Sequence, residues 1–199
     1  MSPSPVKRAV VLVPIRSFDD AKSRLADVLS ADERRALART MAATVVMAAR
    51  DLPVKVVTDD SDVGGWARSV GATVLEPGVS GLNPSIALAF AEVRSELDPV
   101  TGRVIIAHAD LPLAHDLRVV DGPGVAIAPD RHRDGSNVMS IPASADFEFA
   151  YGPGSFELHQ READRLGLGV TVIDDPALAL DIDHPDDLAE LASRQPATD

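Results

Sequence analysis

The chain has no cysteine among its 199 residues, and this absence excludes disulfides, thiolate metal ligands and cysteine nucleophiles. Basic residues are scarce as well: 19 Lys and Arg stand against 31 Asp and Glu, which gives a net charge of −12. A field of that sign repels a nucleic-acid backbone, so we expect no DNA or RNA partner. A nucleotide is still admissible, because a metal ion or a few local cations can override the global field.

The chain also lacks a long hydrophobic run. The apolar stretch at 9–15 is too short for a signal-peptide core and far too short to span a bilayer. We therefore expect a soluble cytoplasmic protein with no membrane partner. With 45% apolar and 25% charged residues, the composition is typical of a globular chain, and the length suits one domain. We expect that domain at 9–194, between flexible termini at 1–8 and 195–199.

Three familiar motifs are missing too. The sequence has no G-x-x-x-x-G-K-[ST], which excludes a P-loop, and no G-x-G-x-x-G follows the first predicted strand, which argues against a dinucleotide dehydrogenase. No glycine-flanked serine precedes a suitable helix, so a serine-hydrolase triad is not indicated.

Apolar β-branched runs alternate with helical stripes along the chain, a pattern typical of an α/β sandwich with a mostly parallel sheet. Ser30 and Glu33 have capping-box spacing before one helix, and Asn83-Pro84 resembles an N-cap followed by the first helical residue of another. We expect strands at 10–13, 54–58, 73–75, 103–107, 125–128, 137–141 and 170–173, and helices at 31–48, 63–70, 84–97, 156–166 and 186–193.

Polar residues after the strands are the candidates for function, because ligands of open α/β sheets bind beyond the carboxyl ends of the strands. After the first strand come Arg16, Lys22 and Arg24, three cations within nine residues of an acidic chain. They suit a cradle for a triphosphate, and equally a solvated helix face.

Three carboxylates form a second group of candidates. Asp110 follows the strand at 103–107, and Asp181 and Asp183 precede the last helix, which Pro185 introduces. Each could hold a metal ion, and each could instead cap a turn or a helix.

Two glycine-rich polar segments, 134–137 and 151–156, complete the set. Both suit hairpin turns. The second also resembles an anion nest, because glycine and serine amides stand there at the start of a helix.

Together these motifs resemble those of the guanylyltransferases of deazaflavin-coenzyme biosynthesis, which act on 2-phospho-L-lactate or phosphoenolpyruvate and are similar to molybdenum-cofactor nucleotidyltransferases. The family usually has Lys at the position of Arg16 and Thr at that of Ser136, and the loop at 116–124 is short here. The matching segments are Val13-Pro14-Ile15-Arg16 with Ala21-Lys22-Ser23-Arg24-Leu25, Gly81-Leu82-Asn83, Ala109-Asp110-Leu111-Pro112, Asp130, Asp134-Gly135-Ser136-Asn137, Phe149-Ala150-Tyr151-Gly152-Pro153-Gly154-Ser155-Phe156 with His159, and Asp181-Ile182-Asp183-His184-Pro185-Asp186-Asp187-Leu188.

The resemblance implies a single-domain, GT-A-like nucleotidyltransferase: a three-layer α/β sandwich with a mostly parallel mixed sheet. It implies transfer of GMP from GTP to a small phosphorylated carboxylic acid, with Mg²⁺ as cofactor and pyrophosphate as the second product. The residue roles that it implies are catalysis by Lys22, Asp110 and Asp181; nucleotide binding by Arg16, Lys22, Arg24 and Asn83; metal binding by Asp110, Asp181 and Asp183; and acceptor binding by Ser136, Gly152 and Ser155.

Two other functions fit the pattern less well. A molybdopterin or sugar-phosphate nucleotidyltransferase would usually show a glycine-rich loop after the first strand, which this chain lacks. A nucleotide-binding module without catalysis should have lost a metal carboxylate or the phosphate lysine, yet Lys22, Asp110 and Asp181 are all present. The sequence leaves open which phosphorylated acid is the acceptor, with 3-phospho-D-glycerate as a third choice. It also leaves open which of Asp181 and Asp183 ligates the metal, and whether the chain forms a homodimer.

Overall fold

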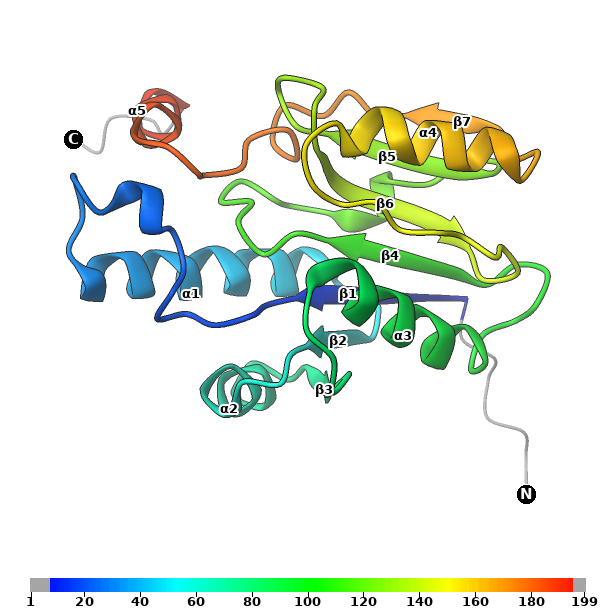
Figure 1. Ribbon diagram of the computed structural model, residues 1–199, viewed down its shortest axis with the longest axis horizontal. Coiled ribbons are helices and arrows are strands. Elements are labelled where there is room, and N and C mark those ends of the chain that lie inside the picture. Colours follow the sequence, from blue (N-terminus) through cyan, green and yellow to red (C-terminus); the bar gives the residue numbers. More distant parts are fainter. Residues whose placement is uncertain (1–7, 195–199) are drawn as a thin grey trace.

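A seven-stranded sheet in the order β3-β2-β1-β4-β6-β5-β7 forms the middle of the computed structural model, which describes residues 8–194 (Figure 1). Strands β1 to β4 pair in parallel, β6 runs antiparallel to both β4 and β5, and β7 is parallel to β5. The predicted mostly parallel mixed sheet is confirmed. The strands are β1 Ala9–Pro14, β2 Val54–Val57, β3 Thr73–Leu75, β4 Arg103–Ala107, β5 Val125–Pro129, β6 Ser136–Pro142 and β7 Val170–Val172.

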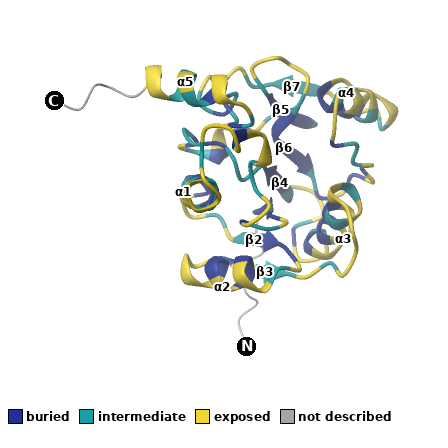
Figure 2. Cartoon of the chain, turned by 60° about the vertical axis from the view of Figure 1, so that its left-hand side comes forward, coloured by how far each residue is buried: buried dark blue, intermediate teal, exposed yellow. Residues whose placement is uncertain are grey.

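Helices cover both faces of the sheet and make the three predicted layers. Val11 and Val13 of β1 face a core shared with α1 (Ala31–Ala48) and α2 (Ser61–Ser69). Val10 and Leu12 face the opposite core, shared with α3 (Leu82–Arg94) and α4 (Ser155–Arg165). Because successive side chains of a strand point to opposite faces, a strand covered on both sides must be apolar throughout. Figure 2 shows β4, β5 and β6 as buried strands in the middle of the molecule.

A third, smaller core lies at the carboxyl end of the sheet. Leu25 is the last residue of the short 3₁₀ turn η1 (Ser23–Leu25) and packs with Met41 of α1 and with Leu180 and Ile182. Leu188 and Leu191 of α5 (Pro185–Arg194) pack against the same cluster. A second 3₁₀ turn, η2, covers Leu117–Val119. The small core therefore anchors both the loop after β1 and the segment before α5.

The first residues of α1 and α3 can be compared with the caps predicted from the sequence. The capping box at Ser30 is present, with the Glu33 amide donating to Ser30 Oγ and the Ser30 amide donating to the Glu33 carboxylate. The predicted N-cap at Asn83 is wrong: α3 begins at Leu82, with Gly81 as its N-cap at φ 100°, a conformation that favours glycine. Asn83 is not free to cap, because its side-chain amide is bonded to the backbone of Tyr151.

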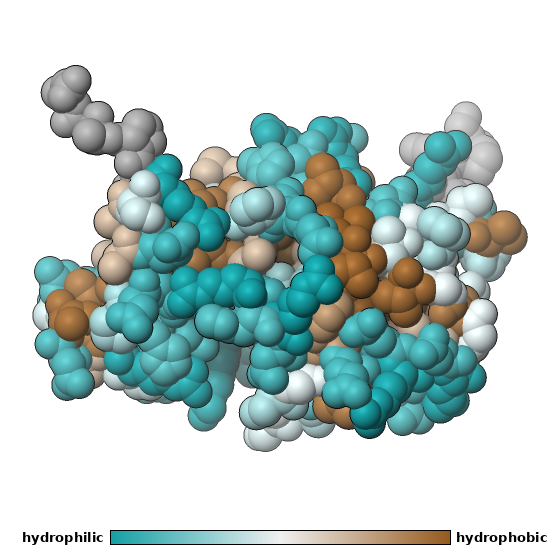
Figure 3. Space-filling view, turned by 90° about the horizontal axis from the view of Figure 1, so that it is seen from above, coloured by the Kyte–Doolittle hydropathy of each residue, from teal (hydrophilic) through white to brown (hydrophobic). Residues whose placement is uncertain are grey.

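The predicted flexible ends at 1–8 and 195–199 lie outside the described residues, except Arg8, whose carbonyl accepts the amide of Arg103. The face shown in Figure 3 is mainly hydrophilic, with apolar residues gathered in a band near its middle. Between residues 8 and 194, none of the helices combines the length and the apolar content needed to cross a bilayer.

Candidate functional site

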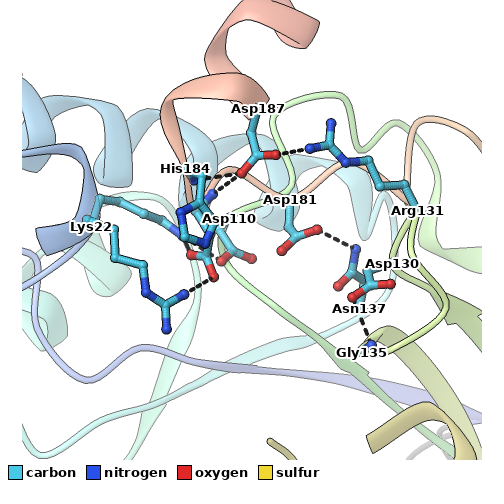
Figure 4. Close-up of polar contacts among 11 residues, drawn as sticks. Lys22, Asp110, Asp130, Arg131, Gly135, Asn137, Asp181, His184 and Asp187 are labelled. Carbon is cyan, nitrogen blue, oxygen red and sulfur yellow. Dashed lines mark hydrogen bonds and ion pairs between the residues drawn. The ribbon is translucent and has the colours of Figure 1, made fainter. Parts of the chain in front are cut away.

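Side chains from three distant parts of the chain meet beyond the carboxyl ends of β1 and β4 (Figure 4). Lys22 Nζ lies 2.6 Å from Asp110 Oδ2 and 3.0 Å from Asp183 Oδ1. Arg24 Nη1 lies 3.1 Å from the other carboxylate oxygen of Asp183. The structure thus brings together two of the predicted phosphate-binding cations and two of the predicted metal carboxylates.

Lys22 reaches this position from a constrained backbone. Its φ of 56° is left-handed, which is uncommon for a residue with a β-carbon, and its side chain is only 10% exposed. The following turn buries Leu25 completely, and this burial together with the two ion pairs compensates the backbone cost. Burial alone lowers the pKa of Lys22, but the charges of Asp110 and Asp183 outweigh it and raise that pKa above its usual value.

The side chains of Asp110 and Asp181 lie near each other, and both residues are partly buried. The amide of Ile182 donates to the carbonyl of Asp110, which holds the two segments together. Burial raises the pKa of Asp181, and the charge of Asp110 raises it further. Burial acts in the same direction on Asp110, but the Lys22 and His108 charges outweigh it and lower its pKa.

The donor set suits a hard divalent cation. Asp110 Oδ1 is buried and has no hydrogen-bond partner within the described residues, so one strong acceptor there is free. A cation would also relieve the repulsion that raises the pKa of Asp181. Among residues 8–194 there is no group of three or more His, Asp and Glu side chains placed to hold a metal. Mg²⁺ commonly uses one or two carboxylates together with waters and substrate phosphates, so the predicted ligands fit it chemically.

Two adjoining pockets open beside this cluster. The smaller, about 160 Å³, is lined by Lys22, His108 and Asp110 among others. The larger, about 670 Å³, lies at the ends of β1, β2 and β3 and is lined by Arg16, Asp59 and Gly81 among others. Its volume is in the range of small-molecule sites.

Not all predicted nucleotide-binding side chains share one pocket. Arg16 lines the larger pocket and Lys22 the smaller one. Arg24 is bonded to Asp183. Asn83 donates to the carbonyl of Tyr151 at 3.1 Å and accepts the Tyr151 amide at 2.7 Å, so both ends of its amide are used inside the fold.

The three predicted acceptor residues are neighbours, but the two serines are buried. Ser136 is 1% exposed and Ser155 is 2% exposed. The Ser136 amide donates to Ser155 Oγ at 3.1 Å, and the Ser155 amide donates to the carbonyl of Gly152 at 3.0 Å. What the two serines still offer a ligand is the hydrogen of each hydroxyl group.

His159 fixes the direction of the Ser136 hydroxyl. The amide of Ala150 donates to His159 Nε2 at 3.1 Å, so that nitrogen carries no hydrogen and Nδ1 carries it. His159 Nδ1 lies 2.9 Å from Ser136 Oγ and therefore donates to it, which leaves the Ser136 hydrogen to point elsewhere. Burial lowers the pKa of His159 to about 4, with a further contribution from His108, which keeps the ring neutral.

The amides at the start of α4, predicted to form an anion nest, are largely engaged by the chain itself. The Gly154 amide donates to Asp134 Oδ1 at 3.1 Å and the Phe156 amide to the Asp134 carbonyl at 2.9 Å. Asp134 thus supplies the negative group that a helix N-terminus favours. An acceptor phosphate would have to bind beside this carboxylate.

Sequence reasoning assigned no role to Asp134, His159, Arg131 or Asp187, although three of them lie in the quoted motifs. The position of Asp187 was the available signal: it is the third residue of a helix that begins with proline, where an acidic side chain can reach back to the preceding amides. Arg131 gave no local signal, because its partner lies 56 residues away.

Comparison with known proteins gives a match over nearly the whole chain. Residues 9–195 match the family model described as "Guanylyl transferase CofC like". A phosphoenolpyruvate guanylyltransferase of Sphaerobacter thermophilus is 38% identical over 94% of each chain. A 2-phospho-L-lactate guanylyltransferase of Methanocaldococcus jannaschii is 28% identical, covering 91% of this chain and 81% of the relative.

Solved structures agree on the fold. A crystal structure from Desulfovibrio desulfuricans G20, assigned to the nucleotide-diphospho-sugar transferases, superposes with a TM-score of 0.74. It covers 96% of this chain and 90% of the other at 16% identity. This likeness shows the same GT-A-like architecture and, at that identity, the fold alone.

Proposed function

Because the chain belongs to the family of CofC-like guanylyl transferases, it is a nucleotidyltransferase, and we propose that it transfers GMP from GTP to a small phosphorylated carboxylic acid. The acceptor is phosphoenolpyruvate, 2-phospho-L-lactate or 3-phospho-D-glycerate, and the product serves deazaflavin coenzyme 420 biosynthesis. The observation that carries the proposal is the family match over 9–195, and the Lys22–Asp110–Asp183 cluster supports it as a charged site beyond the carboxyl ends of the strands. We propose that the reaction takes place in the cytoplasm.

The two adjoining pockets suggest how GTP lies. The nucleoside occupies the larger pocket, where Arg16 is the cation, and the triphosphate extends toward Lys22 in the smaller one. Arg24 is close enough to the same cluster to add charge there. Since the amide of Asn83 is committed to Tyr151, we assign Asn83 to shaping the pocket wall at the start of α3.

Asp110 and Asp181 are the proposed Mg²⁺ ligands, with Asp183 beside them. The free Asp110 Oδ1 and the mutual repulsion of Asp110 and Asp181 support this choice. When bound, the ion would screen the negative charge of two phosphate groups that must approach each other. Lys22, held between Asp110 and Asp183, adds a fixed positive charge at the same place.

Ser136, Gly152 and Ser155 are the proposed acceptor contacts. The hydroxyl of Ser136 is held as an acceptor by His159, so its hydrogen is free to donate to an anion. Asp134 already occupies the amides at the start of α4, so we expect the serine hydroxyls, rather than a bare nest, to make the contacts.

The reaction asks the protein mainly for positioning and charge neutralisation. An oxygen of the acceptor phosphate attacks the α-phosphorus of GTP in line, a new phosphorus–oxygen bond forms, and the bond to the β-phosphate oxygen breaks. Pyrophosphate leaves with the electron pair. The attacking oxygen is already an anion, so no general base is needed. This explains why the neutral, buried His159 orients a hydroxyl and does not take a proton.

A pyrophosphate-release assay tests the proposal. Purified protein receives GTP, Mg²⁺ and each of the three acids in turn, with CTP and ATP as alternative nucleotides, and unstable product is coupled to the next enzyme. We expect release with GTP and one acid, abolished in Asp110→Asn and retained in Asp186→Asn, which alters an exposed carboxylate of α5. Release only with another nucleotide, or with none, contradicts the proposal. Light scattering on the same sample gives the oligomeric state, for which a homodimer is one expectation.

A further inference from the structure

Arg131 and Asp187 form an ion pair that the proposed chemistry does not use. Arg131 lies in the loop after β5, and Asp187 is the third residue of α5. Asp187 is only 5% exposed, so its carboxylate is held inside the protein. Burying a charged group costs free energy unless the group is paired and hydrogen-bonded, so the partners of Asp187 determine whether it is tolerated there.

The second oxygen of Asp187 binds the backbone next to the candidate site. Asp187 Oδ2 accepts the amide of Asp183 at 2.8 Å and that of His184 at 2.6 Å, while Oδ1 faces the Arg131 guanidinium (Figure 4). Three donors thus surround one carboxylate. One of them is the amide of Asp183, whose own side chain contacts Lys22.

Residues from the loop after β5 and from β6 also bind the rest of the segment between β7 and α5. The Arg131 amide donates to the carbonyl of Ala179 at 2.9 Å. Asn137, from β6, donates to the carbonyl of Leu178 at 3.0 Å and to Asp181 Oδ1 at 3.4 Å. No regular helix or strand holds the chain between β7 and α5, so these contacts and the burial of Leu180 and Ile182 set its path.

We propose that Asp187, held by Arg131, is a positioning residue that aims the Asp183 carboxylate at the cation site and thereby sets the affinity of that site for a divalent ion. It acts through the Asp183 backbone and touches neither substrate. The inference rests on the proposed metal role of Asp110, Asp181 and Asp183. It adds that the loop after β5 determines how well these carboxylates are placed.

Asp187→Asn is the diagnostic change, because it keeps the size of the side chain and replaces one acceptor oxygen by a donor NH₂ group. In either orientation that group meets a donor, either Arg131 or the amides of Asp183 and His184, and the segment must shift. Glu190→Gln is the matched control. It removes a carboxylate of the same helix that pairs with Arg194 at 2.7 Å and lies away from Asp183.

Two measurements separate positioning from simple stabilisation. Mn²⁺ binding to the full chain without substrates is measured by electron paramagnetic resonance, and the Mg²⁺ dependence of turnover is measured at saturating GTP. In Asp187→Asn we expect Mn²⁺ affinity to fall at least fivefold and the half-saturating Mg²⁺ concentration to rise at least tenfold. The KM for GTP at saturating Mg²⁺ should change less than twofold, and Glu190→Gln should match the wild type in all three.

Arg131→Lys keeps the charge and loses the planar fork, so its Mn²⁺ affinity should lie between those of the wild type and Asp187→Asn. If Asp187→Asn does not fold, the Mn²⁺ affinity of Arg131→Lys is compared with that of the wild type instead. A lower melting temperature with unchanged Mn²⁺ affinity in the variants, or a wild type that does not bind Mn²⁺, overturns the inference. A wild type that binds Mn²⁺ without transferring GMP overturns the proposed function alone.

Discussion

Replacing Lys22 by Met should free the cation site at a cost in stability. Lys22 Nζ lies 2.6 Å from Asp110 and 3.0 Å from Asp183, so its positive charge opposes the binding of a second cation beside these carboxylates. Met keeps most of the apolar stem and removes the charge. Within the described residues, Asp110 Oδ2 then loses its bond to Lys22, and the buried Oδ1 already has no hydrogen-bond partner there.

The size of the effect follows from the burial of the pair. Breaking a buried ion pair by removing one partner costs about 3–5 kcal/mol. Asp183 is 41% exposed and keeps Arg24, so the loss falls mostly on Asp110, and the lower end, about 3 kcal/mol, is the better expectation. For a chain of this size that corresponds to a melting temperature about 6–12 °C lower.

Added Mg²⁺ should return part of this stability. A tenfold gain in the affinity of the native state for Mg²⁺ adds about 1.4 kcal/mol at saturating ion. The assay is thermal unfolding at neutral pH with and without Mg²⁺, in the absence of GTP, for wild type, Lys22→Met and the control Arg24→Met. Arg24 is 63% exposed, and within residues 8–194 its one ion pair is with Asp183, so its variant should behave nearly as the wild type. Equal Mg²⁺-induced shifts in the wild type and Lys22→Met would refute the idea that the charge of Lys22 weakens Mg²⁺ binding at these carboxylates.

Three further predictions follow from the site. Asp110→Asn should keep its fold, as judged by circular dichroism, and lose about 10²- to 10³-fold in kcat at any Mg²⁺ concentration; near-normal turnover would remove Asp110 from the metal site. Asn83→Ala should lower the free energy of unfolding in urea by about 1–3 kcal/mol, because the amide and carbonyl of Tyr151 lose their partner. Ser85→Ala, at a more exposed contact, should lower it little. Equal losses in the two variants would contradict a structural role for Asn83. Burial lowers the pKa of His159 to about 4, so the unfolded chain binds more protons than the native one between about pH 6.5 and 4, and stability should fall by up to about 3 kcal/mol as the pH drops through that window. Urea unfolding at several pH values checks this, and a slope in His159→Gln as steep as in the wild type would show that another group is responsible.

Local signals were sufficient for most of the fold. The apolar β-branched run of β1 predicts a strand covered on both faces, and Ser30 with Glu33 predicts the start of α1, because each pattern depends on residues a few positions apart. The alternation of strands and helices then predicts the parallel part of the sheet. One general rule, that ligands bind beyond the carboxyl ends of parallel strands, was enough to make both Lys22 and Asp110 candidates for function, but it did not predict their contact across 88 residues.

Local sequence patterns are sufficient to predict the elements, their order and the polar residues that lie at one edge of the sheet. Which hydrogen-bond groups remain available at that edge depends on contacts between distant parts of the chain. Asn83 carries the sequence signal of an N-cap, but Tyr151, 68 residues away, takes its amide. The amides at the start of α4 suit an anion, but the Gly154 amide already donates to Asp134. Asp187 accepts the amide of Asp183, and its other carboxylate oxygen pairs with Arg131 from a different loop. A helix or strand depends on neighbours in the chain, whereas each donor and acceptor is claimed by whichever group the fold places nearest to it.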